Sequence, residues 1–205
     1  MLKIAVFVSG RGSNLKAIID AIENKNLNAE IKLIISNKAD CAAFKLADLK
    51  NIPTFCVSAS RKENYLTFDE ISELLKNTFI DLIVLAGFLK KIPDNFIDKF
   101  ESKIINIHPA LLPAFGGKGM FGMNVHKAVY DSTAKVSGVT IHFVDKIYDN
   151  GKIIVQKCVD ISRVKSPEEI ADKVLAEEHK LLPLTIKLFS ENKIKVERDR
   201  VFIED

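Results

Sequence analysis

Short apolar runs alternate with stretches of helical periodicity through the first half of the chain. Five of these runs have the length and composition of buried strands: Ile4–Val8, Ile31–Ile35, Thr54–Val57, Asp81–Ala86 and Ile104–Ile107. Apolar residues at helical spacing lie between them, for example Leu15, Ile18, Ile19 and Ile22. Strands that alternate with helices predict a doubly wound α/β fold, with a mostly parallel central sheet covered on both faces.

The pattern changes after His108. Residues 114–123 contain four glycines and little periodicity, which predicts a long loop. Alternating stretches at residues 138–144 and 152–159 predict two strands, and the Asp149-Asn150-Gly151 sequence between them is a tight-turn signal. We therefore expect a β-hairpin in the C-terminal half.

A long helix is predicted at the end of the chain. Ser166 suits the N-cap, Pro167 the first helical position, and Glu169 stands three residues after the serine. The helix is expected to run to about Ser190, with Pro183 as a site for a kink.

The composition is that of an ordinary soluble globular protein. Of 205 residues, 47% are hydrophobic and 28% are charged, and we expect one domain over residues 1–205. The formal net charge of +3 is too small to indicate nucleic-acid binding by electrostatics alone. An anionic ligand is therefore expected to be held by a few local groups.

The cysteines and the N-terminus favour a cytoplasmic protein. Cys41, Cys56 and Cys158 are isolated and include no C-x-x-C pair, so neither a disulfide framework nor a zinc site is expected. The first apolar run stops at Gly10 and is too short for a signal peptide or a membrane span.

A glycine-containing loop, Ser9-Gly10-Arg11-Gly12-Ser13-Asn14, follows the first strand and opens a helix. Backbone N–H groups and a helix N-terminus at this place suit an anion. A dinucleotide motif would need glycine in place of Leu15 and an acidic residue where Ser36-Asn37 stands, and the lysine of a P-loop is absent. Two interpretations remain: a monophosphate site at residues 12–14, or a plain turn with Ser13 or Asn14 as the N-cap.

Asn106, His108 and Asp149 are candidate catalytic residues. The first two flank Ile107 at the end of a predicted strand, so alternation points both side chains to one side. An amide beside an imidazole suits stabilisation of an oxyanion, and a carboxylate near the imidazole would favour its charged form. Structural alternatives stay open, because Asn106 and His108 also suit a strand end and Asp149 suits a turn.

No serine or cysteine nucleophile competes with this set. The sequence has no G-x-S-x-G motif, and Cys158 lies in an alternating strand where a packed thiol is expected. Direct transfer is favoured over a covalent intermediate.

In five ordered segments the chain closely resembles the phosphoribosylglycinamide formyltransferases of purine biosynthesis. The segments are residues 8–15, 36–40, 84–88, 106–113 and 138–151, and Glu178-His179 follows them. The resemblance covers nearly the whole chain. It implies the formyltransferase fold, with a Rossmann-like phosphate-binding half over residues 1–107 and a folate-binding and catalytic half over residues 108–205.

The resemblance also implies site residues in this chain. The phosphate of glycinamide ribonucleotide would be bound by Gly12, Ser13 and Asn14, and the other end of that substrate by Glu178. The folate would be bound by Lys62, Leu89, Lys90, Lys91, Ile92 and Asn106. The catalytic trio would be Asn106, His108 and Asp149, with no metal.

The reaction implied is direct formyl transfer. The glycinamide amine would attack the formyl carbon of 10-formyltetrahydrofolate, while Asn106 and protonated His108 stabilise the oxyanion. Asp149 would keep His108 charged and position a proton-shuttling water. The partners expected are these two small molecules, without nucleic acid or membrane, for a monomer or homodimer.

Four positions depart from the family pattern or leave a choice. Arg61 could replace Lys62 as the basic folate contact. Gly116-Gly117-Lys118-Gly119 replaces a proline-containing loop, and Lys146 stands where an acidic residue is usual. His126 is expected either to contact or frame the substrate or to lie on a helix surface.

Three alternative functions stay open. Formyltetrahydrofolate deformylase and methionyl-tRNA formyltransferase share the core machinery but are expected to carry additional domains, for which 205 residues leave no room. A nucleotide-sensing module without catalysis would retain the phosphate loop and lose the catalytic trio.

Overall fold

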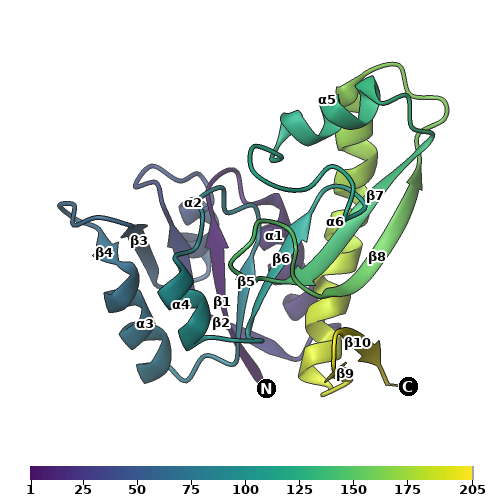
Figure 1. Cartoon of the computed structure of the whole chain (residues 1–205). Coiled ribbons are helices and arrows are strands. Elements are labelled where there is room, and N and C mark those ends of the chain that lie inside the picture. Colours follow the sequence, from purple (N-terminus) through teal and green to yellow (C-terminus); the bar gives the residue numbers. More distant parts are fainter. Residues whose placement is uncertain (205) are drawn as a thin grey trace. The chain divides into compact units, whose positions relative to one another are not determined.

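The computed structural model describes residues 1–204. The chain divides into two compact units, Met1–Asn106 and Ile107–Asp205, and each is described here by itself. Figure 1 shows the order of the elements along the chain.

The first unit is built on a parallel sheet. Its strands are β1 (Leu2–Val8), β2 (Ala29–Ser36), β3 (Thr54–Ser58), β4 (Leu66–Thr67), β5 (Leu82–Leu85) and β6 (Ile104–His108), the last of which continues into the second unit. Their spatial order is β4-β3-β2-β1-β5-β6, and each neighbouring pair runs parallel. The carboxyl ends of all these strands therefore lie along one edge of the sheet.

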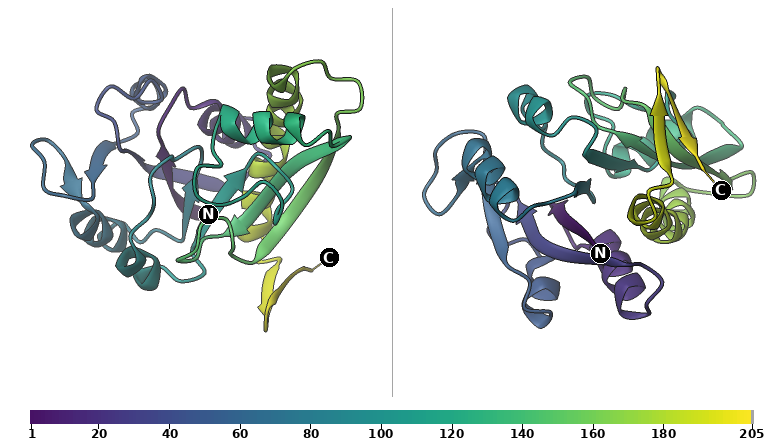
Figure 2. Two further views of the ribbon diagram at one scale, coloured as in Figure 1. Left: turned by 45° about the horizontal axis from the view of Figure 1, so that its top comes forward. Right: turned by 90° about the horizontal axis from the view of Figure 1, so that it is seen from below.

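Helices cover both faces of this sheet. They are α1 (Ser13–Glu23), α2 (Phe44–Leu49), α3 (Phe68–Asn77) and α4 (Asp94–Lys99). Figure 2 shows α1 and α2 on one face and α3 and α4 on the other. Under α4, the ring of Phe7 makes edge contacts with Phe88 and Phe96, with centroids 5.4 and 6.1 Å apart. The predicted doubly wound α/β class with a mostly parallel sheet is confirmed.

The second unit consists of a hairpin packed against a long helix. Its elements are α5 (Met123–Asp131), β7 (Val136–Phe143), β8 (Ile153–Asp160), α6 (Pro167–Ser190), β9 (Ile194–Glu197) and β10 (Arg200–Ile203). Strands β7 and β8 pair antiparallel, which confirms the predicted hairpin, and α6 contacts both of them. Phe143 from β7 meets Phe189 from α6 edge to face, with centroids 5.9 Å apart.

The start of α6 is confirmed. The side chain of Ser166 accepts a hydrogen bond from the N–H of Glu169, and Pro167 stands at the first helical position. The helix continues through Pro183 to Ser190 as one element.

The tight turn predicted at residues 149–151 is wrong. Strand β7 ends at Phe143, and the chain returns as β8 only after Lys152. The N–H of Phe143 donates to the carbonyl of Lys152 (2.9 Å), which closes the base of a longer loop. Gly151 is needed at that base, because a Cβ would lie 1.8 Å from the carbonyl oxygen of Phe143.

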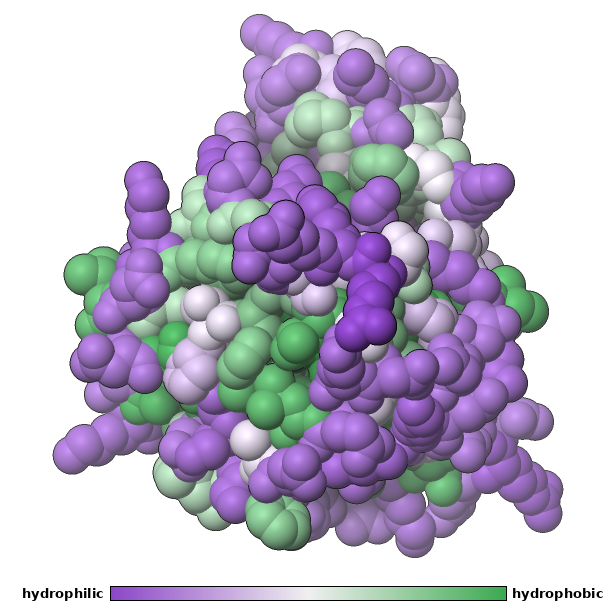
Figure 3. All heavy atoms as spheres, turned by 90° about the vertical axis from the view of Figure 1, so that its left-hand side faces the viewer, coloured by the Kyte–Doolittle hydropathy of each residue, from purple (hydrophilic) through white to green (hydrophobic). Residues whose placement is uncertain are grey.

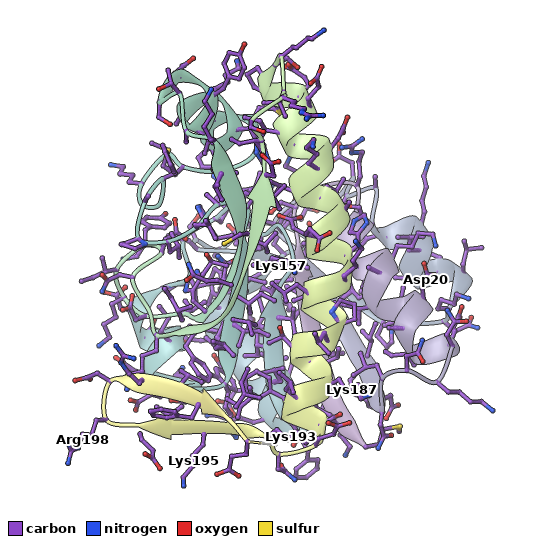
Figure 4. The ribbon with its side chains drawn as sticks, turned by 90° about the vertical axis from the view of Figure 1, so that its right-hand side faces the viewer. Asp20, Lys157, Lys187, Lys193, Lys195 and Arg198 are labelled. Carbon is purple, nitrogen blue, oxygen red and sulfur yellow. The ribbon has the colours of Figure 1, made fainter. Side chains whose placement is uncertain are left out.

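Basic side chains on the second unit alternate with carboxylates. Figure 4 labels Lys187, Lys193 and Lys195 along the end of α6 and the β9–β10 hairpin. Lys187 and Lys193 lie 3.7 and 3.8 Å from Glu191, and Lys195 lies 3.0 Å from Glu197. These lysines are therefore locally neutralised, in keeping with the small net charge.

Candidate active site

Residues expected in the site follow three neighbouring strands of the first unit. Gly12 comes after β1 and Leu89 comes after β5. Asn106 is the last residue of β6 that pairs with β5. Because β1, β5 and β6 are adjacent and parallel, these residues share the carboxyl edge of the sheet. That edge is where open α/β sheets bind ligands.

Gly12 is the residue that caps α1. It has φ 79°, a left-handed conformation, and a Cβ there would lie 2.7 Å from the Cβ of Ala43. The alternative in which Ser13 or Asn14 is the N-cap is therefore wrong. Asn14 is buried in the first turn of the helix, and Ser13 is half-buried.

Ser9 ties the end of β1 to the segment after β5. Its hydroxyl donates to Asn37 and accepts the N–H of Leu89 (2.9 Å). Leu89, Lys90 and Lys91 are exposed, whereas the side chain of Ile92 is buried in the core. Ile92 can therefore meet a ligand only through its backbone.

Lys62 is exposed beyond β3. Its ammonium nitrogen lies 3.9 Å from the ring centroid of Tyr65, whose hydroxyl accepts the N–H of Ala39. Arg61 is exposed as well, so the choice between Arg61 and Lys62 as a folate contact stays open.

The second unit brings His108 and Asp149 together. The His108 Nδ1 lies 3.6 Å from the Asp149 Oδ2, and both side chains are largely buried, 3% and 11% exposed. Asp149 adopts φ 54°, a conformation that aspartate tolerates better than most residues. The opposite nitrogen of His108, Nε2, lies 2.9 Å from the carbonyl oxygen of Phe115. A carbonyl can only accept, so Nε2 carries a hydrogen and Nδ1 is the atom that gains or loses a proton.

Residues 115–117, which we call the strap, lie over this pair. Gly117 donates its N–H to the Asp149 Oδ2 (2.8 Å), while the Phe115 carbonyl accepts from His108. Phe115 has φ 55°, which is unusual for a bulky residue. A Cβ on Gly116 would lie 2.5 Å from Leu112 and 3.1 Å from the Cβ of Asp149, so glycine permits this close approach.

A second imidazole faces the other oxygen of Asp149. The His142 Nε2 lies 3.7 Å from Oδ1, and its Nδ1 donates to the carbonyl of Phe143 (2.8 Å). The register of β7 against β8 shifts between Ile141 and His142, and such irregularities re-aim side chains next to functional sites. Asp149 thus lies between two histidines.

Thr140 fixes the segment that follows His108. Its hydroxyl donates to the carbonyl of Ala110 (2.7 Å) and accepts the N–H of Leu112 (3.0 Å). Gln156 from β8 donates to Thr140 (3.0 Å) and to the carbonyl of Leu112 (2.9 Å). The backbone after His108 is therefore held against the hairpin that carries His142.

Burial and neighbouring charges perturb both members of the His108–Asp149 pair. Burial would raise the pKa of Asp149, but His142, His108 and the Gly117 N–H outweigh it, so this pKa lies below its ordinary value. Burial lowers the pKa of His108, while Asp149 and the Phe115 carbonyl raise it. The net pKa of His108 is lowered, so the expected effect of Asp149 is present but burial exceeds it.

Two further residues named from the sequence are buried in the second unit. Glu178 lies within α6 and is 7% exposed, and His126 lies within α5 and is 6% exposed. The helix-surface alternative for His126 is therefore wrong. Burial and the charge of His108 both lower the pKa of His126.

A shallow apolar groove lies elsewhere, in the first unit. It has a volume of about 530 Å³, and Phe55, Leu66 and Leu74 form its apolar part. Figure 3 shows the side of the molecule on which β3, β4 and α3 lie, with apolar surface among hydrophilic side chains. The groove includes none of the residues expected to bind substrate or folate.

Residues 1–204 contain neither a cluster of metal ligands nor a membrane-spanning helix. No group of three or more His, Cys, Asp or Glu side chains in that range is arranged to hold a metal ion. None of its helices has the length and apolar character needed to cross a bilayer.

Comparisons with known proteins identify the family of this chain. The family model described as "Formyl transferase" matches residues 2–186. The chain belongs to the formyl transferase family. That family assignment agrees with a polar site at the carboxyl edge of a parallel sheet.

Individual members of the family align with nearly the whole chain. The phosphoribosylglycinamide formyltransferase of Arabidopsis thaliana chloroplasts is 42% identical over 97% of this chain and 69% of its own length. That of Haemophilus influenzae is 35% identical over 100% of this chain and 94% of its own. The crystal structure of phosphoribosylglycinamide formyltransferase from Anaplasma phagocytophilum matches with TM-score 0.89 and 36% identity, covering 100% of this chain and 94% of that one.

The sequence did not reveal every group of this site. His142 stood in a stretch recognised only as a strand, and its signal was an imidazole in an otherwise apolar alternation. The Phe115 carbonyl and Gly117 N–H are backbone groups of a loop without periodicity, and no side-chain pattern indicates them.

Proposed function

We propose that the chain transfers the formyl group of 10-formyltetrahydrofolate to the amine of glycinamide ribonucleotide. The observation that carries the proposal is the buried pair of His108 and Asp149, whose facing atoms lie 3.6 Å apart. His108 stands two residues after Asn106 on β6, and the chain is a formyl transferase. Relatives that share nearly the whole chain include phosphoribosylglycinamide formyltransferases that are 35–42% identical to it. We place the protein in the cytoplasm, acting on these small molecules.

The reaction needs an oxyanion to be stabilised. The amine nitrogen attacks the formyl carbon, the bond from that carbon to the folate N10 breaks, and one proton passes from the amine to N10. We assign the Asn106 amide and the His108 Nε2–H to the oxyanion of the tetrahedral intermediate. In this structure the Nε2–H is bonded to the Phe115 carbonyl, so the oxyanion would take the place of that carbonyl.

Asp149 is assigned to proton control. Its carboxylate faces the His108 Nδ1, the atom that gains the proton, and its own lowered pKa keeps it ionised at neutral pH. As negative charge develops on the formyl oxygen, an imidazolium paired with Asp149 becomes more favourable. A water held by the same carboxylate would carry the proton away from the amine.

Substrate binding is assigned as the family pattern implies. Gly12, Ser13 and Asn14 would hold the phosphate at the start of α1, and Glu178 the other end of the ribonucleotide. Lys62 and the segment Leu89–Ile92 would contact the folate, together with Asn106. The single-domain organisation and the monomer-or-homodimer state stay predictions.

An assay with three alternative acceptors tests the function. The purified chain is supplied with 10-formyltetrahydrofolate and, in separate reactions, glycinamide ribonucleotide, water alone or initiator methionyl-tRNA. We expect formylation of the ribonucleotide and little release of formate. Turnover with water alone would indicate a deformylase instead, and turnover with the tRNA a methionyl-tRNA formyltransferase.

A further inference from the structure

His126 carries a buried polar atom without a partner. Its side chain is 6% exposed, and Nδ1 has no hydrogen-bond partner within residues 1–204. An unsatisfied buried nitrogen destabilises the folded state, so such atoms are rare in folded proteins. A group retained at that cost needs a reason, and a partner supplied by a ligand is one.

The position of His126 indicates which ligand supplies that partner. It lies in the first turns of α5, which begins at Met123 directly after the glycine-rich loop. Asn124 of the same helix donates to the carbonyl of Gly119 (3.1 Å), which ties the helix start to the loop that carries the strap. Through the strap, the same loop contacts His108 and Asp149, so α5 follows directly from the segment that covers this pair.

We propose that His126 is a substrate-binding residue whose Nδ1 hydrogen-bonds a neutral hydroxyl or amide group of a molecule bound at His108. This inference rests on the proposed function for the identity of that molecule. Burial and the charge of His108 both disfavour a positive charge on His126, so a neutral polar group suits it better than a phosphate. Both proposed substrates carry such groups, and the test distinguishes them.

Three substitutions separate binding from packing. His126→Asn keeps a polar atom near the place of Nδ1, His126→Gln places one nearer to Nε2, and His126→Leu keeps the bulk without any polar atom. We expect kcat/KM to fall about 10-fold or more in His126→Leu, to a similar extent in His126→Gln, and by less than about 3-fold in His126→Asn. The substrate whose KM rises identifies the molecule that His126 contacts.

Thermal stability separates a binding role from a packing role. If His126 served only packing, His126→Leu would lower the Tm. Replacing an unsatisfied imidazole by leucine removes its desolvation cost, so the Tm of His126→Leu should equal that of the wild type or exceed it by up to about 4 °C. Ser137 is a matched control, because its hydroxyl is also buried without a partner within the described chain, at the opposite end of β7 from His142. Ser137→Ala should likewise keep or raise the Tm, with unchanged kinetics.

The outcomes are decisive either way. Reduced kcat/KM in His126→Leu at undiminished Tm, with recovery in His126→Asn, supports the proposal. Wild-type kinetics in His126→Leu, or a loss of Tm and activity together in both variants, overturns it. A ligand-induced rise in Tm, measured with glycinamide ribonucleotide or tetrahydrofolate, is expected for wild type and His126→Asn and reduced for His126→Leu. This binding arm decides the role of His126 even if formyl transfer itself is not observed.

Discussion

His108 presents its two ring nitrogens to two different acceptors: Nδ1 faces the Asp149 carboxylate at 3.6 Å, and Nε2–H is bonded to the Phe115 carbonyl at 2.9 Å. The carbonyl fixes which nitrogen carries a hydrogen in the neutral ring. The carboxylate makes the other nitrogen the place where a second proton is gained. A donor and a proton-binding site are thereby separated on one imidazole.

Removing the carboxylate should change the pH dependence of the reaction. Asp149 raises the pKa of His108 against the larger effect of burial, so Asp149→Asn should lower that pKa further. The imidazolium then disappears at lower pH, and we expect the rate to fall chiefly at neutral and alkaline pH. The measurement is kcat between about pH 5.5 and 9.

A charge-matched control accompanies this substitution. Asp160 ends β8, at the far end of the hairpin from Asp149, so Asp160→Asn removes the same charge without touching His108. Asparagine also tolerates the φ of 54° at position 149, so the loop is expected to persist. An unchanged pH profile in Asp149→Asn would show that Asp149 serves only the loop.

Gly12→Ala should disrupt the loop before α1 for two separable reasons. Its Cβ would meet the Cβ of Ala43 at 2.7 Å, and φ 79° is unfavourable for any residue with a side chain. We expect a loss of about 1–3 kcal/mol in the free energy of unfolding, and a raised KM for glycinamide ribonucleotide. Urea denaturation and steady-state kinetics measure the two effects.

The double variant Gly12→Ala/Ala43→Gly separates the steric part from the backbone part. Glycine at position 43 removes the contacting methyl group but leaves the strain in φ. We expect a positive coupling between the two substitutions and only partial recovery of stability. Strictly additive losses would mean that the contact with Ala43 does not limit position 12.

Thr140 should support His108 through the backbone that follows it. Thr140→Val keeps the shape of the side chain but removes the hydroxyl bonded to Ala110, Leu112 and Gln156. We expect a loss of about 1–3 kcal/mol in stability and a lower kcat, because segment 110–112 loses its attachment to the hairpin. Thr140→Ser, which keeps the hydroxyl, should retain kcat. Equal kcat in the two variants would separate this network from catalysis.

Much of the fold was predictable because burial imposes simple patterns. Strands such as Ile4–Val8 and Ile104–Ile107 are apolar runs between breaks, and Ser166 with Pro167 fixes the start of α6. The β9–β10 hairpin was not predicted, although residues 194–203 contain alternating apolar residues. Strand β4 was missed as well, because two residues are too few to show any period.

The site was predictable only where side chains carry its chemistry. His108 and Asp149 were identified from residue type and position, and the structure brings them together. The tight hairpin turn predicted at residues 149–151 is instead a longer loop over residues 144–152, in which the Asp149 carboxylate accepts the N–H of Gly117. The Phe115 carbonyl is a backbone group, so no pattern of side chains predicts its contact with His108.

The central claim is that His108 stabilises the transition state of formyl transfer to glycinamide ribonucleotide. The measurement is single-turnover formylation by the wild type and His108→Ala, with the binding of glycinamide ribonucleotide determined for both by calorimetry. We expect wild-type turnover, unchanged ribonucleotide affinity in the variant, and a rate reduced by about 10²–10³-fold or more, because a preorganised donor is lost from a buried site. A wild-type rate in folded His108→Ala would contradict the account.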